Sequence, residues 1–138
     1  MGAIELLERL ASANIPIALI RNSELDESDF QKRLSLTGTA KYFDVKTNVV
    51  LSGELGFEKP DPKIFVHCLR KCKLQHQLEK SPHRVLYIGN ETDVDIVGAN
   101  AVGWKSCLIR NTEKTSNGRA TFEVDNFEEI WNLIKGDV

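Results

Sequence analysis

The chain has 138 residues, of which 41% are hydrophobic and 28% are charged, and its formal net charge is -2. This size fits one domain with a buried core, and the charge lacks the basic excess that nucleic-acid or anionic-membrane binding requires. No apolar run approaches the ~20 residues of a membrane span, and the N-terminus has no signal-peptide pattern. Three cysteines are too few for a disulfide framework, so we predict a cytoplasmic protein with reduced thiols.

Helices and strands alternate through the first part of the chain. Apolar residues at helical spacing predict a helix over 4–11, and the unbroken run IPIALI predicts a buried strand over 15–20. Ser23 or Asp26 can cap a second helix, and the β-branched run VVLS predicts a short strand at about 48–51.

The second part of the chain continues the alternation. Asp61 is a good N-cap and Pro62 fits the first position of a third helix, after which the polar residues 75–83 are expected to form a loop. The remaining predicted elements follow in chain order: a strand at 85–89, a helix at 93–103, a strand at 105–109, a polar loop at 111–120, an edge strand at 121–125 and a helix at 127–135.

This alternation predicts the fold class. Strands that alternate with helices through short loops indicate an α/β protein with a three-layer, Rossmann-like and mainly parallel sheet, and we assign residues 1–138 to one domain. Functional sites in such folds lie at the carboxyl ends of the strands.

Two of the loops at these strand ends carry unusual residues. Residues 89–95, GNETDVD, place three carboxylates at a helix N-terminus, where they either cap the helix or form a hard oxygen site of the type that magnesium uses. Lys59 precedes Pro60 and Pro62 and is either a solvated loop lysine or a fixed cation opposite the acid cluster. Together they predict that a cation, a metal and an anionic ligand meet at one sheet edge.

Other residues have a simpler interpretation. Cys68, Cys72 and His76 recur at helical spacing and could be metal ligands, but the two cysteines belong to the apolar face of the third helix. Trp104 and Trp131 occupy hydrophobic positions and are expected to pack in the core.

Three stretches of the sequence resemble the haloacid dehalogenase (HAD) superfamily. KPDPKIF, followed by VLYIGN, an acidic loop and DIVGANAVGW, is similar to its third and fourth signature motifs, and GAIELLERLASANIPIALIRN is similar to the helix and strand before its second motif. FEVDNFEEIWNLI resembles its last strand and helix. The resemblance implies a magnesium-dependent hydrolase of phosphatase or dehalogenase type, which attacks a small phosphorylated or halogenated substrate through an aspartyl intermediate.

The resemblance also implies roles for individual residues. Lys59 would be catalytic, because it neutralises the negative charge of the nucleophile and the phosphoryl group. The residues that would bind phosphate are Arg21, at the position of the second-motif hydroxyl, Asn22 and Lys59. The residues that would hold Mg²⁺, directly or through water, are Asp95 and either Asn90 or Glu91.

The sequence departs from the family pattern at the first motif. Family members begin with a strand that ends in DxDx[TV], whose first aspartate is the nucleophile, and usually carry a cap domain; these 138 residues contain neither. The only DxD, Asp93 to Asp95, begins a helix and lacks the residues that follow the true motif. We therefore expect a truncated HAD core that is inactive alone and is catalytic only if a longer form of the gene product or a partner chain supplies the nucleophile strand. The alternative is a non-catalytic interaction or scaffold module.

The absent strand also has a consequence for the sheet. In the family it is central, between the strands that correspond to 15–20 and 85–89. These two strands would then either close up on each other or accept a strand from a partner chain or a second copy, since unpaired strand edges favour pairing.

Overall fold

The computed structural model describes residues 1–110 and 115–136. Its main elements, in chain order, are α1 (Ala3–Ser12), β1 (Leu19–Arg21), α2 (Glu27–Leu36), β2 (Val49–Leu51), α3 (Pro62–Lys71), α4 (Gln75–Leu78), β3 (Leu86–Gly89), the π-helical turn η3 (Thr92–Ile96), α5 (Val97–Ala101), β4 (Lys105–Ile109), β5 (Phe122–Val124) and α6 (Phe127–Lys135). The polar loop predicted at 111–120 falls partly on 111–114, which lie outside the described residues.

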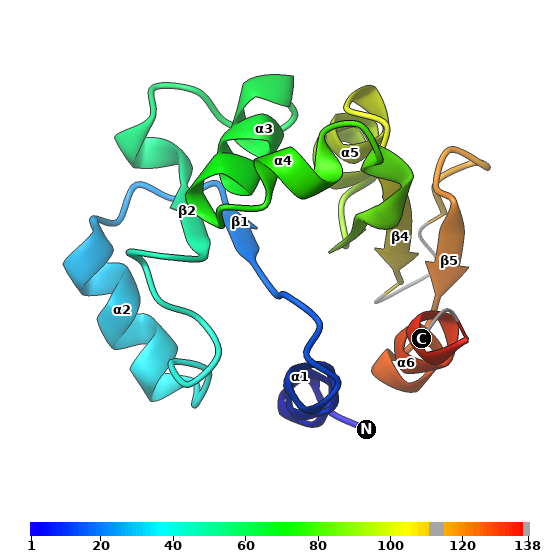
Figure 1. The fold of residues 1–138 in the computed structure, drawn as a ribbon, viewed down its shortest axis with the longest axis horizontal. Helices are drawn as coiled ribbons and strands as arrows, with labels where there is room; N and C mark the ends of the chain where they lie inside the picture. The colour runs from blue at the N-terminus through cyan, green and yellow to red at the C-terminus, as the bar shows by residue number, and fades with distance from the viewer. Residues whose placement is uncertain (111–114, 137–138) are drawn as a thin grey trace.

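All the described strands run parallel, but they form two sheets. β1 pairs with β2, with Leu19 opposite Val49, and β3 pairs with β4, which pairs with β5. Helices α3, α4 and α5 lie on one side of the strands, and α1 and α6 lie on the other (Figure 1). The predicted α/β class with helices on both faces is therefore confirmed.

The strands β1 and β3 do not close up on each other. Within the described part of the chain, β1 pairs only with β2, and β3 pairs only with β4. Of the two alternatives for these strands, direct pairing is therefore not found, and one edge of each strand has no partner strand among these residues.

Two predictions of secondary structure need correction. The strand expected at 15–20 begins only at Leu19, because its ladder starts where the Leu19 N–H donates to the carbonyl of Asn48 (2.9 Å). The loop expected at 75–83 contains the one-turn helix α4 and a 3-10 turn at Pro82–Arg84.

The helix starts follow the predicted caps. Asp26 accepts the N–H of Asp29 (2.8 Å) at the start of α2, and Asp61 accepts the N–H of Lys63 (2.9 Å) at the start of α3. Ser23, the other candidate cap for α2, lies before the helix, and its N–H donates to the Ser52 hydroxyl (2.9 Å).

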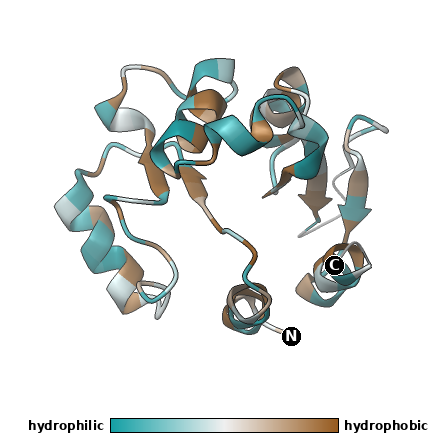
Figure 2. Cartoon of the chain, in the orientation of Figure 1, coloured by the Kyte–Doolittle hydropathy of each residue, from teal (hydrophilic) through white to brown (hydrophobic). Residues whose placement is uncertain are grey.

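Hydrophobic residues fill the space between the layers. They are concentrated in the strands, whereas α2 and α4 present mainly hydrophilic residues (Figure 2). Phe65 and Trp104 are buried in the cluster between the strands and α3, as predicted for Trp104. Trp131 is half-buried in a second cluster, which lies between the strands and the helices α1 and α6. No helix among the described residues is long and apolar enough to cross a membrane.

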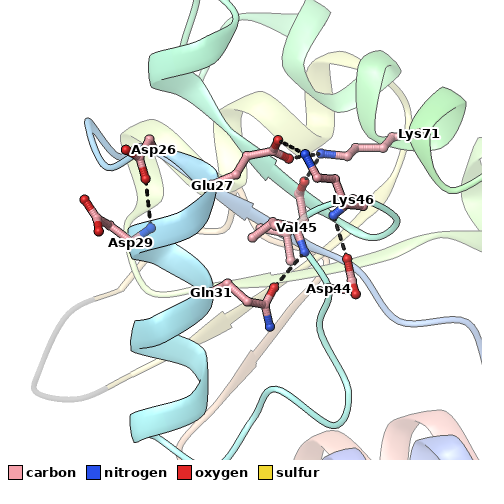
Figure 3. A network of polar contacts seen from close by, with 9 residues as sticks. Asp26, Glu27, Asp29, Gln31, Asp44, Val45, Lys46 and Lys71 are labelled. Atoms are coloured by element: carbon pink, nitrogen blue, oxygen red, sulfur yellow. Dashed lines mark hydrogen bonds and ion pairs between the residues drawn. The ribbon is translucent and has the colours of Figure 1, made fainter.

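A polar network joins α2 to its neighbours. One oxygen of Glu27 is 2.7 Å from the Lys46 ammonium, and the other is 3.8 Å from that of Lys71, so these side chains converge (Figure 3). Lys71 also donates to the carbonyl of Val49 (2.6 Å). Glu27 therefore links α2 to the loop before β2 and to the end of α3.

Candidate functional site

Lys59 and Asp95 meet at the carboxyl ends of the strands. The Lys59 Nζ lies 2.7 Å from the Asp95 Oδ1, and their side chains are only 11% and 7% exposed. Lys59 comes from the loop before α3, and Asp95 comes from η3, which follows β3. The structure thus brings together the two residues that the sequence predicts as a fixed cation and its acidic counterpart.

Asn22 holds the backbone of Lys59 in place. Its side-chain amide donates to the Lys59 carbonyl (3.1 Å), and its side-chain oxygen accepts the Lys59 N–H (2.9 Å). Both polar groups of Asn22 are therefore engaged with Lys59, which differs from the direct phosphate contact that the resemblance implies. Arg21, at the end of β1, is exposed.

The carboxylate of Asp95 is fixed by two neighbouring backbone groups as well. Its Oδ2 accepts the N–H groups of Asn90 and Glu91, both at 3.2 Å. Gly89 allows this close approach, because a Cβ at that position would overlap the Asp95 side chain. The Glu91 carbonyl accepts from both Asp95 N (2.8 Å) and Ile96 N (3.4 Å), which widens the turn into a π-helix.

The predicted metal ligands differ in their exposure and in their contacts. Asn90 and Glu91 are exposed, whereas both oxygens of Asp95 already accept hydrogen bonds. Within residues 1–110 and 115–136, no group of three or more histidines, cysteines, aspartates or glutamates could hold a metal ion. Mg²⁺ usually keeps several waters and takes only one or two carboxylates beside substrate phosphates, so a hard donor set of this kind fits its chemistry.

Tyr87 is a site residue that the sequence reasoning missed. The Lys59 Nζ donates to its hydroxyl (3.2 Å), and its ring packs edge-on against Phe65, with 5.2 Å between the ring centroids. Burial raises the pKa of Tyr87, and the negative charge of Asp95 acts in the same direction, so the hydroxyl stays neutral. The available signal was a hydroxyl group in the otherwise apolar strand VLYIG, two residues before Gly89.

Asp93 takes part in a different contact. Its carboxylate lies 3.2 Å from the Arg119 guanidinium, and their side chains are 88% and 48% exposed. Asp93 is therefore a solvated residue at the start of η3, in contrast to the nearly buried Asp95.

Comparisons with known proteins agree on one family. The haloacid dehalogenase-like hydrolase family model matches residues 2–103. The chain is 31% identical over 137 residues to pyrimidine 5′-nucleotidase YjjG of Escherichia coli, covering 96% of this chain and 55% of that protein. It is 32% identical over 93 residues to a glyceraldehyde 3-phosphate phosphatase of Methanopyrus kandleri, covering 63% of this chain and 37% of that protein. The chain thus spans about half or less of the length of these relatives.

Solved structures show the same fold. A HAD phosphatase from Thermococcus onnurineus superposes with a TM-score of 0.76 at 24% identity, covering 96% of this chain and 56% of that chain. A HAD-superfamily hydrolase from Ehrlichia chaffeensis gives a TM-score of 0.72 at 24% identity, covering 98% and 57%. Because the family model matches most of the chain and a relative is 31% identical over 96% of it, the chain belongs to the haloacid dehalogenase-like hydrolases.

Proposed function

We propose that this chain forms part of the catalytic core of a magnesium-dependent phosphatase and that it is inactive until a carboxylate nucleophile is added to it. The observation that carries this proposal is the ion pair between Lys59 and Asp95, 2.7 Å apart and nearly buried at the carboxyl ends of the strands. The relatives whose names describe phosphatases of small molecules favour a phosphorylated substrate over a halogenated one.

Lys59 is the group that would contact the phosphoryl oxygens. Its ammonium has three N–H donors, of which Asp95 and Tyr87 accept two, so one remains for an anion. A cation held in a site of low exposure interacts strongly with a charge that develops beside it. Arg21, exposed at the end of β1, would add a second cation for the same anion.

Glu91 and Asn90 are the residues that would hold Mg²⁺, with Asp95 acting through water because its own oxygens are engaged. When bound, the metal would neutralise negative charge on the phosphoryl group and orient it. The chain's own contribution is to place Lys59 through Asn22, Asp95 and Tyr87.

The nucleophile would come from a further segment. The only DxD in these residues includes Asp95, which is engaged by Lys59, and the solvated Asp93. The strands β1 and β3 each have one edge without a partner strand in the described part of the chain, and their carboxyl ends lead to Asn22 and to Asp95, which both contact Lys59. A strand that completes the sheet, from a longer form of this chain, a partner chain or a second copy, would bring its last residues to Lys59.

Inorganic phosphate binding in the presence of Mg²⁺ tests the electrostatic part of this proposal. Calorimetric titration of the chain should show phosphate binding that Lys59→Gln abolishes and Arg21→Gln weakens. Lys41→Gln is the matched control, because the Lys41 ammonium lies over the Tyr42 ring, away from this site. Equal affinities for the Lys59→Gln variant and the unmodified chain would refute the assignment.

The unpaired edges also support a second candidate function. Among the described residues, β1 and β3 are both edge strands, and an edge strand can bind an extended segment through backbone hydrogen bonds without catalysis, as in an interaction module. The two functions differ in outcome once a segment is bound. A phosphatase core that has gained its nucleophile would release phosphate, whereas an interaction module would not.

A further inference from the structure

The Lys59 ammonium is held by two acceptors of different character. The Asp95 Oδ1 lies 2.7 Å from Nζ and carries a charge, whereas the Tyr87 hydroxyl lies 3.2 Å from Nζ and is neutral. A lysine side chain is a flexible four-carbon stem with a rotatable ammonium, so one contact alone leaves the direction of the other N–H groups undefined. Two contacts define the direction of the third N–H.

The ring of Tyr87 is itself well fixed. Phe65 meets it edge to face, with an interplanar angle of 74°, and Trp104 lies 6.2 Å away between ring centroids. In the ladder of β3 and β4, Tyr87 is opposite Ser106. Because both the backbone and the ring are held, the hydroxyl has a defined position from which to accept the hydrogen bond from the Lys59 ammonium.

The neutrality of this second acceptor matters for an anionic ligand. Lys59 and Asp95 together carry no net charge, and a phenol that accepts a hydrogen bond leaves that balance unchanged. A second carboxylate at the same place would make the cluster negative and repel a phosphoryl group.

We propose that Tyr87 is a positioning residue, whose hydroxyl directs the Lys59 ammonium so that its remaining N–H points to the bound anion. The inference rests on the proposed function for the identity of that anion, a phosphoryl group. The orientation of Lys59 does not depend on it and can be measured separately.

Exchange of the Lys59 ammonium protons with water tests the positioning directly. In protein with ¹⁵N-labelled lysine, Tyr87→Phe keeps the ring and removes the acceptor, and we expect exchange about tenfold faster, as for the loss of one hydrogen bond to a charged group. Tyr42→Phe, which removes the other tyrosine hydroxyl of the chain, should leave the rate unchanged. An unchanged rate in Tyr87→Phe would overturn the proposal.

A second measurement covers the case in which Tyr87→Phe does not fold. In the unmodified chain, the Lys59 ammonium should show a nuclear Overhauser contact to the Tyr87 ring protons, and its absence would contradict the proposal. Phosphate affinity in the presence of Mg²⁺ should fall several-fold in Tyr87→Phe. If Tyr87→Phe speeds exchange but the unmodified chain binds no phosphate, the proposed function fails while the role of Tyr87 stands.

Discussion

At the scale of single residues, the site is an ion pair removed from most of the solvent. Lys59 and Asp95 are 11% and 7% exposed, so each pays a desolvation cost that the other offsets. The Asp95 carboxylate accepts three hydrogen bonds, from Lys59, Asn90 and Glu91. Removing one partner leaves the other charge without compensation.

A double-mutant cycle measures this coupling. Asp95→Asn should lower the free energy of unfolding by about 3 kcal/mol, because it leaves the Lys59 charge nearly buried and unpaired. Lys59→Met combined with Asp95→Asn should lose less than the sum of the two single changes, as measured by urea unfolding. Additive losses would show that the two residues do not interact.

Glu123 gives the pH dependence that the structure predicts. Hydrogen bonds from the Ser116 N–H (3.1 Å) and hydroxyl (3.0 Å) lower the pKa of Glu123 below its ordinary value. A lowered folded-state pKa means that the stabilisation is present above the ordinary pKa and is lost as the pH falls through the folded value. Glu123→Gln should therefore be less stable than the unmodified chain at pH 7, and the difference should shrink at pH 3, by thermal unfolding; a difference that grows on acidification would contradict this.

The proximity of Lys59 and Asp95 could be predicted from local signals in the sequence. Lys59 and Asp95 stood out because prolines and neighbouring carboxylates mark them, and the structure places them together. Tyr87 was missed because an aromatic residue in a strand usually packs in the core. Its hydroxyl gains a role only because the Lys59 ammonium reaches it in the folded chain.

At the scale of elements, α3 connects the site to the core. Asp61 caps its N-terminus, and Ile64 and Phe65 are fully buried in its apolar face. Lys59 lies two residues before this cap, so the packed helix anchors the loop that carries it. The sequence predicted this start because Asp61 and Pro62 are local signals. The extent of β1 could not be predicted in the same way, since it depends on the partner strand β2.

Removing the cap of α3 should affect both stability and the site. Asp61→Ala should lower the free energy of unfolding by about 1 kcal/mol and weaken phosphate binding, because the loop that holds Lys59 loses its anchor. Asp26→Ala, which removes the corresponding cap of α2, should cost a similar stability without changing phosphate affinity. Equal binding losses in the two variants would indicate a general effect of destabilisation.

Amide hydrogen exchange should reveal the open edge of β3. Along a strand that pairs on one side only, alternate N–H groups point away from the partner, so protected and fast-exchanging amides should alternate through Leu86–Gly89. In β4, which pairs on both sides, the amides should be protected throughout. Uniform protection along β3 would mean that its second edge is covered in solution.

At the scale of the whole molecule, the described strands form two separate sheets of parallel strands, and residues that follow or belong to each sheet contact Lys59. Asn22 follows β1 and holds the Lys59 backbone, while Tyr87 and Asp95 come from β3 and the turn after it and hold the ammonium. The fold class followed from the alternation of elements along the chain. The separation into two sheets did not, because strand pairing is a long-range property that local patterns leave undetermined.

The central proposal is that these residues supply the electrostatic part of a phosphatase site and need a carboxylate nucleophile from a further segment. The most direct test is magnesium-dependent release of phosphate from an aryl phosphate, measured for the chain alone and with an added peptide whose apolar strand ends in aspartate. We predict no release by the chain alone above the Lys59→Ala control, and release with the peptide that is lost when its aspartate becomes asparagine. Turnover by the chain alone that disappears in Asp93→Asn would contradict the claim.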